Sequence, residues 1–512
     1  MKVVVGRVPI VLRLAAGSEL PAVRGGGRAG VRWLRIGLYL LLLTGCVRTP
    51  PYQAPDVAAP AQWKNLPDSA RAAMVAIPAS APSTETQKPA LGAWWALFND
   101  PDLTALEQQA VGGNYSLQAA VARVEAARAN VRVAASYRQP TVALVPQTYR
   151  TRLSALRPLP FAVATDGRSL GAVQSQYYVP LTVSYEVDVW GRLRGGIRAA
   201  NADAQAAEAE AETVRLTLTA DAADYYYSIR GLDAELAVLD TARRDREYSL
   251  KLAQARYKAG VDNEIASRRA ETELASLEAS LIEAQRQRAG LVAALATVVG
   301  VPASSFDVSS RPSALTSPPV PAAVPATLLG RRPDLRQAER QIAAANARAD
   351  VARLTRLPTV SLNGFVGPQS AQLSKLGNVS DSYTYYVGGG VNIPVFNGGR
   401  NRANQQVAES QYNAATAQYR QAALVAFQEV ETALANVRQT AVQIMAQQRA
   451  LRAARQASLL TKERYRRGLT DYFQVVDADR QTLDAARLLV QAQGNQLSYT
   501  VQLIRALGGG WE

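Results

Sequence analysis

Histidine is absent from this chain of 512 residues, and cysteine occurs only once. The missing histidine excludes His general bases, His metal ligands and every Ser-His-Asp or Cys-His triad. A single cysteine excludes an intrachain disulfide and a Cys zinc cluster. Carboxylates, Lys or Tyr could still support catalysis, but no constellation of them stands out. We therefore expect no enzyme, no metal site and no cofactor.

Long hydrophobic runs are also lacking. The run 36–43 is far shorter than the roughly 20 residues of a membrane-spanning helix, and the most apolar helical run, 289–301, predicts packed core. Arginines precede 36–43 and small residues follow it, which is the pattern of a secretory signal. We assign residues 1–45 to a signal peptide.

The single cysteine lies where cleavage of this signal is expected. The sequence LTGC at 43–46 resembles the bacterial lipobox, whose cysteine is lipidated, for example with palmitate, and becomes the new N-terminus. We predict lipidation at Cys46; the alternative is a buried cysteine that happens to follow a signal. Val47, which is not Asp, resembles the pattern of outer-membrane retention. Residues 46–93, rich in Pro and Ala, then form a lipid-anchored extended tether.

The net charge of +15 is not concentrated in one patch of the mature chain. A basic balance can indicate nucleic acid or an anionic surface. Here Lys and Arg alternate with Asp and Glu along predicted helices, which is typical of solvated helix faces. We expect no nucleic-acid partner.

The chain is internally duplicated. Four motifs recur in the same order: LQAA at 117–120 as LRQA at 335–338, QPTV at 139–142 as LPTV at 357–360, GRLR at 191–194 as GRNR at 399–402, and YKAG at 257–260 as YRRG at 465–468. The first repeat therefore covers 94–301 and the second covers 328–512. The Pro- and Ser-rich segment 302–327 links them.

Each repeat shows the same order of secondary-structure signals. A helical segment, 103–137 or 334–356, precedes two strand-like segments, and a long helical hairpin follows. In 179–189 every odd position is apolar, and apolar residues also alternate in 384–395. This period of two predicts a sheet with one apolar and one polar face. Aromatic residues gather near these strands, as they do at the interfaces of membrane barrels and in ordinary cores.

The hairpins begin with unusually long helices. Small and apolar residues recur at steps of three and four from 197 to 218 and from 222 to 239, which predicts a heptad seam. No proline interrupts 191–257, so a continuous helix there would extend about 95 Å at 1.5 Å per residue. Glycines end the long helices before the second helices return: Gly260 before 264–299, and Gly468 before 472–507.

These elements have a consequence for assembly. Four strands per chain cannot close a barrel, and an open sheet edge is not stable in lipid. If the strands span a membrane, several chains must contribute them to one barrel. The long helices carry charges throughout, so they must extend beyond the membrane. We therefore expect a mixed α/β membrane protein in which a shared β-barrel continues as a coiled-coil tube.

The residues resemble the TolC-type outer-membrane factors, and most closely the lipidated efflux subunits of the NodT type, from Trp94 to the C-terminus. Four features carry the resemblance in the family's order: WWxLFxDPxL at 94–103, RRPDL at 331–335, the YxxG helix ends of both repeats, and LIRALGGGW at 503–511. The resemblance implies a homotrimer in the outer-membrane lipid, with a 12-stranded barrel and a twelve-helix α-helical periplasmic tunnel. It also implies a passive duct for small-molecule efflux and multidrug resistance, a periplasmic adaptor (membrane fusion) protein at the helix tips, and an inner-membrane pump of RND type.

The resemblance also assigns roles to single residues. The family's constriction carries carboxylates six and nine residues after the second tip glycine, and these positions hold Gln474 and Asp477. Three Asp477 side chains around a threefold axis would attract cations. Asp479 is a helical neighbour that could contribute instead, and a solvated helix charge is the alternative for Asp477.

The first repeat holds Ala266 and Arg269 at the equivalent positions, so one helix pair is expected to line the pore and the other to pack outside. Two further sets of residues complete the candidate sites: the adaptor-docking helix tips Tyr257, Gly260, Tyr465 and Gly468, and the strand-to-helix turns Gly191 and Gly399.

Two other functions stay open at this point. The same kind of channel could serve type I secretion of proteins or peptides. A pore-free, lipid-anchored coiled-coil protein of the envelope would also explain the helices and the anchor.

Overall fold

A computed structural model describes residues 52–65, 92–152, 154, 173–311, 315–319, 328 and 330–509. The predicted signal peptide and Cys46 lie outside the described residues, as do much of the predicted tether and much of the linker 302–327.

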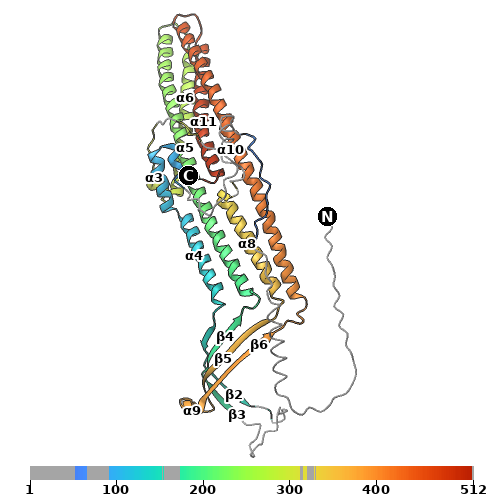
Figure 1. Ribbon diagram of the computed structural model, residues 1–512. Helices are drawn as coiled ribbons and strands as arrows, with labels where there is room; N and C mark the ends of the chain where they lie inside the picture. The colour runs from blue at the N-terminus through green and yellow to red at the C-terminus, as the bar shows by residue number, and fades with distance from the viewer. Residues whose placement is uncertain are drawn as a thin grey trace, which may run out of the picture. The chain divides into compact units, whose positions relative to one another are not determined.

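In both halves a helical segment precedes the strands, and a long helical hairpin follows them (Figure 1). The first half consists of η1 (Trp94–Phe98), α3 (Pro101–Gly113), α4 (Tyr115–Ser136), β1 (Thr141–Leu144), β2 (Gln147–Arg152), β3 (Val173–Tyr178), β4 (Leu181–Val187), α5 (Arg192–Lys258), α6 (Glu264–Val299) and η2 (Ala303–Ser305). The second half consists of α8 (Pro333–Leu354), β5 (Thr359–Ser370), η3 (Leu373–Lys375), α9 (Val379–Ser382), β6 (Tyr383–Asn392), α10 (Arg400–Arg466) and α11 (Tyr472–Ala506).

The strands form one antiparallel sheet in which β1 pairs with β4, β2 with β3, and β5 with β3, β4 and β6. Pro146 separates β1 from β2, and Pro180 separates β3 from β4, because proline has no N–H to donate. Each of these pairs continues as one long bent strand. The sheet therefore has four strands in the order β1/β2, β4/β3, β5, β6, as the sequence predicted.

The outer strands of this sheet are open. Within the described residues, β1/β2 and β6 each have a hydrogen-bonded neighbour on one side only. Their other sides present unpaired backbone donors and acceptors, which is the arrangement that recruits a further strand.

The helices differ from the sequence-based expectation at one point. The segment 103–137 contains two helices, α3 and α4, because Gly112 and Gly113 end the first and Asn114 caps the second. The Asn114 side chain accepts a hydrogen bond from Leu117 N at 3.0 Å and donates one to Val298 O at 2.9 Å. This break also ties α4 to the end of α6.

The buried residues of α5 extend beyond the heptad seam that was predicted within 197–239. Ala204 and Leu218 of the seam are buried, but so are Ala199, Ala202 and Ala209, which lie outside it. The helix packs against α4, α6, α8 and α11, so small residues are needed on several faces. Among the described residues, no helix is long and apolar enough to cross a membrane.

The motif WWxLFxDPxL builds one buried cluster. Asp100 Oδ1 accepts hydrogen bonds from Asp102 N at 3.0 Å and Leu103 N at 3.3 Å, which caps α3. Its second oxygen accepts one from the Tyr226 hydroxyl at 2.8 Å. Trp94 donates from Nε1 to Thr219 Oγ1 at 3.2 Å, so the motif fastens α3 to the middle of α5.

The motif RRPDL joins the start of α8 to two other helices. The buried Arg332 pairs with Asp334 at 2.7 Å and with Glu429 of α10 at 2.6 Å. It also donates to Ala506 O at the end of α11 at 3.1 Å. The part of the tether at 52–65 lies along the same region, where the buried Trp63 packs on Phe427 with ring centroids 6.1 Å apart.

Two glycines allow α5 and α11 to meet backbone to backbone. A Cβ at Gly494 would lie 3.4 Å from Gly231 Cα, and one at Gly231 would lie 3.6 Å from Gly494 Cα. Because both positions hold glycine, no side chain of either residue separates the two backbones there.

Candidate functional site

The two helical hairpins end in tips with the same backbone. Gly260 and Gly468 both have φ +71, in the left-handed region that favours glycine. In the first tip Val261 N donates to Arg256 O at 3.0 Å, and in the second Leu469 N donates to Arg464 O at 2.9 Å. The duplicated YxxG motif therefore encodes a repeated helix-ending turn.

The returning helices are capped in the same way. Asn263 Oδ1 accepts from Ala266 N at 3.1 Å, and Asp471 Oδ1 accepts from Gln474 N at 3.1 Å. Because a carboxylate or amide oxygen at this position satisfies a free backbone N–H, α6 and α11 begin at equivalent places.

The tyrosines of the two tips have different environments. Tyr257 is 45% exposed, whereas Tyr465 is 6% exposed. The Tyr465 hydroxyl donates to Asp262 Oδ2 at 3.0 Å, and the Arg256 guanidinium lies 4.9 Å from the centroid of the Tyr465 ring. Burial, together with the neighbouring Asp262, raises the pKa of Tyr465 to about 12. Of the four proposed docking residues, Tyr257, Gly260 and Gly468 are exposed, and Tyr465 instead joins the two tips.

Gln474 and Asp477 lie together on an exposed polar face of α11. The face continues along the helix at steps of three and four residues and is polar except at Leu488: Gln474, Asp477, Gln481, Asp484, Leu488, Gln491 and Asn495. Asp477 Oδ2 accepts a hydrogen bond from Gln481 Nε2 at 2.7 Å, and Gln474 Oε1 accepts one from Thr470 at 2.6 Å. Within the part of the chain that the structure describes, Asp477 forms no ion pair.

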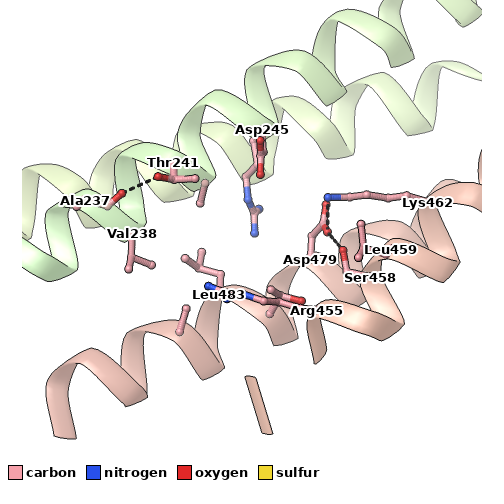
Figure 2. A pocket seen from close by; sticks show the side chains of 14 residues that line it. Ala237, Val238, Thr241, Asp245, Arg455, Ser458, Leu459, Lys462, Asp479 and Leu483 are labelled. Atoms are coloured by element: carbon pink, nitrogen blue, oxygen red, sulfur yellow. Dashed lines mark hydrogen bonds and ion pairs between the residues drawn. The ribbon is translucent and has the colours of Figure 1, made fainter. Parts of the chain in front are cut away.

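Asp479 points away from that face. Its Oδ1 accepts a hydrogen bond from Ser458 at 2.6 Å and lies 2.8 Å from Lys462 Nζ, both on α10 (Figure 2). It borders a cavity of about 530 Å³ between α5, α10 and α11. Asp479 is therefore already paired and is not placed beside Asp477.

The positions equivalent to Gln474 and Asp477 in the first repeat are occupied differently. Ala266 is buried, and the Arg269 guanidinium lies 5.2 Å from the Phe473 ring centroid on α11. At these positions α11 therefore exposes polar side chains, whereas the equivalent residues of α6 are buried or contact α11.

An ion-pair network near the tips was not predicted from the sequence. Glu273 of α6 pairs with Arg246 of α5 and with Arg480 of α11. Burial favours the neutral form of Glu273, but the two arginines outweigh it and hold the pKa of this carboxyl below its usual value. The contact of Asp262 with Tyr465 was also not predicted. The sequence gives one hint of it, because the first tip has an acidic residue, Asp262, where the second tip has the uncharged Thr470.

The acidic residues of this region are side chains of a kind that also bind metal ions. Across the described ranges, no group of three or more His, Cys, Asp or Glu side chains could hold a metal ion. The candidate site instead consists of helix tips, a polar helix face and the contacts that connect them.

An open four-stranded sheet continued by long helical hairpins defines the subunit of a channel. The chain matches the outer membrane efflux protein family over residues 106–301 and 324–509. It is 32% identical to the solvent efflux pump outer membrane protein SrpC of Pseudomonas putida, over 92% of this chain and 97% of that protein. It is 31% identical to the pyoverdine export outer membrane protein OpmQ of Pseudomonas aeruginosa, over 92% of this chain and 95% of the relative.

Solved structures show the same fold. The outer-membrane channel OprN is 29% identical, with a TM-score of 0.79 over 91% of this chain and all of that one. The outer membrane protein VceC of Vibrio cholerae is 28% identical, with a TM-score of 0.73 over 83% of this chain and 100% of its own.

The chain belongs to the outer membrane efflux protein family. It is an outer-membrane channel subunit of an efflux system, with helices that extend into the periplasm. The predicted fold class and efflux function are therefore confirmed.

Proposed function

We propose that three copies of this chain form a passive exit duct for small molecules, with no catalysis of its own. The single observation that carries this proposal is the sheet, which has four strands and two open edges in each chain. Joining three such sheets edge to edge pairs every outer strand and gives a barrel of about 12 strands, which removes the edges.

The helices continue this duct toward the inner membrane. The helices α5 and α10 have 67 residues each and turn back at the tips. The exposed tip residues Tyr257, Gly260 and Gly468 offer a docking surface for a periplasmic adaptor. An inner-membrane pump of RND type supplies the energy, and lipidation at Cys46 anchors the chain to the membrane.

The polar face of α11 forms the inner lining at the periplasmic end. Three copies of Asp477 around a common axis would make a ring of negative charge, which favours cations and narrows the entrance. Gln474 lies on the same face and contributes an uncharged ring. The hydrogen bond from Ser458 and the ion pair with Lys462 support a structural role of Asp479 between α10 and α11.

The experiment is single-channel recording of the purified mature protein in planar bilayers. We expect a small conductance in the absence of adaptor and pump. A folded, inserted trimer that conducts nothing under any voltage would contradict the duct and favour a pore-free envelope protein.

A further inference from the structure

A group of arginines lies where the sheet meets the helices, and among the residues that the structure describes none of them pairs with a carboxylate. The residues are Arg138, between α4 and β1, Arg356, between α8 and β5, and Arg400 and Arg402, at the start of α10. All four are exposed. These residues, here called the arginine belt, belong to the same end of the sheet, at which the strands continue into helices (Figure 1).

Other arginines at this junction are already neutralised. Arg192 pairs with Glu186 at 2.7 Å, and Arg194 pairs with Asp188 at 3.3 Å. By contrast, Arg356 donates only to the uncharged Gln405 at 3.1 Å, and no ion pair of the four belt arginines occurs within the described ranges. The belt therefore carries a positive charge that the described part of the chain does not balance.

Large apolar side chains are exposed beside these arginines. Tyr137 is 66% exposed next to Arg138, and Val395 and Phe396 are 92% and 90% exposed just before Arg400. Exposed aromatic and aliphatic groups next to cations are typical of the boundary between lipid tails and water. A surface facing only water would not favour this combination.

We propose that the arginine belt binds the headgroups of anionic phospholipids in the periplasm-facing leaflet of the membrane. This inference rests on the proposed duct, because the strands must lie in the membrane for the belt to lie at its boundary. A guanidinium binds a phosphate oxygen pair with two parallel N–H donors, so arginine suits this ligand.

The sheet topology extends the belt around the assembly. Arg138 precedes an edge strand and Arg400 follows the opposite edge strand, while Arg356 precedes a central strand. When sheets join edge to edge, Arg138 of one copy approaches Arg400 and Arg402 of the next. The belt then continues across each subunit boundary.

The test is native mass spectrometry of the purified trimer equilibrated with equal amounts of phosphatidylglycerol and phosphatidylethanolamine. We expect the wild type to retain phosphatidylglycerol at least about threefold in excess, since each arginine adds attraction to an anionic lipid. A variant with Arg138→Gln, Arg356→Gln, Arg400→Gln and Arg402→Gln should lose this preference. The four corresponding Arg→Lys changes should keep most of it.

The matched control replaces four exposed arginines of α10 that lie away from the sheet: Arg420→Gln, Arg438→Gln, Arg449→Gln and Arg452→Gln. This control should bind lipid like the wild type. Equal retention of both lipids by the wild type, or an unchanged preference in the belt variant, would overturn the proposal, as would an equal loss in the control. Conductance in phosphatidylethanolamine bilayers tests the duct separately, because the belt variant should still conduct there.

Discussion

The Tyr465 hydroxyl donates a 3.0 Å hydrogen bond to Asp262 Oδ2, across 203 residues of sequence. Tyr465 lies at the end of α10 and Asp262 in the tip between α5 and α6. Asp262 also lies 3.6 Å from Arg256 Nε, so one carboxylate holds both hairpins. The two tips of one chain cannot separate at this point without losing the bond.

Replacing Tyr465 with Phe should loosen this connection. The ring would still pack, but the hydroxyl bond to a charged acceptor, worth about 1.5–3 kcal/mol, would be lost. We expect more frequent openings in single-channel recordings. Tyr257→Phe is the control, since that ring is exposed in the other tip. Identical opening frequencies in Tyr465→Phe and the wild type would show that the bond does not restrain the tips.

Asp477→Ala should raise the single-channel conductance and reduce the preference for cations, because the negative ring at the entrance is removed. Reversal potentials in a salt gradient measure the preference. Glu278→Ala is the control, because Glu278 is an exposed carboxylate on α6 and does not lie on the polar face of α11. A change of equal size in both variants would place the constriction elsewhere.

Gly468→Val should impair coupling to the adaptor. The φ of +71 at this position is strained for a β-branched residue by about 1–3 kcal/mol, so the tip must rearrange. We expect intact trimers on native gels but at least about a tenfold loss of efflux in cells. Leu469→Val, in the same tip, should retain efflux. Normal efflux by Gly468→Val would exclude the tip backbone from coupling.

Glu107→Gln should change how stability depends on pH. Glu107 is fully buried, no described residue hydrogen-bonds to its carboxylate oxygens, and burial raises its pKa to about 9. The unfolded chain loses this proton near the ordinary value of 4.5, so the wild type loses stability as pH rises from about 4.5 to 9. At pH 7 the loss is on the order of 3 kcal/mol.

The glutamine side chain of the variant does not ionise between pH 4.5 and 9, so it does not cause this loss of stability. Its unfolding free energy should therefore exceed that of the wild type at pH 8, and the difference should shrink toward pH 5. Chemical denaturation in detergent at three pH values measures this. Parallel curves for the two proteins would mean that Glu107 is ionised and paired in the assembly.

The sequence predicted the repeated order of elements because duplication and periodicity are local signals. The proline-free segment 191–257 agrees with α5, Arg192–Lys258. The break at Asn114 was missed because a side-chain cap outweighs a helical pattern that otherwise continues. The pairing of Tyr465 with Asp262 could not be predicted, since no spacing relates residues on separate hairpins. Helical spacing places Asp479 on another face of α11 than Asp477, but its α10 partners, Ser458 and Lys462, could not be predicted from the sequence.

At Gly231 and Gly494 the backbones of α5 and α11 are in contact, and one turn along α5 the Glu235 carboxylate accepts hydrogen bonds from Arg487 and Gln491 of α11. These contacts hold α11 at its middle, whereas its N-terminal end lies far from them. Gln474 lies twenty residues from Gly494 along α11, which is a lever arm of about 30 Å. A rotation of about 10° at the glycines would carry the end of that arm about 5 Å sideways. Under the proposed function, a small tilt of α11 at its middle would therefore shift the residues proposed to line the entrance far more than those beside the glycines.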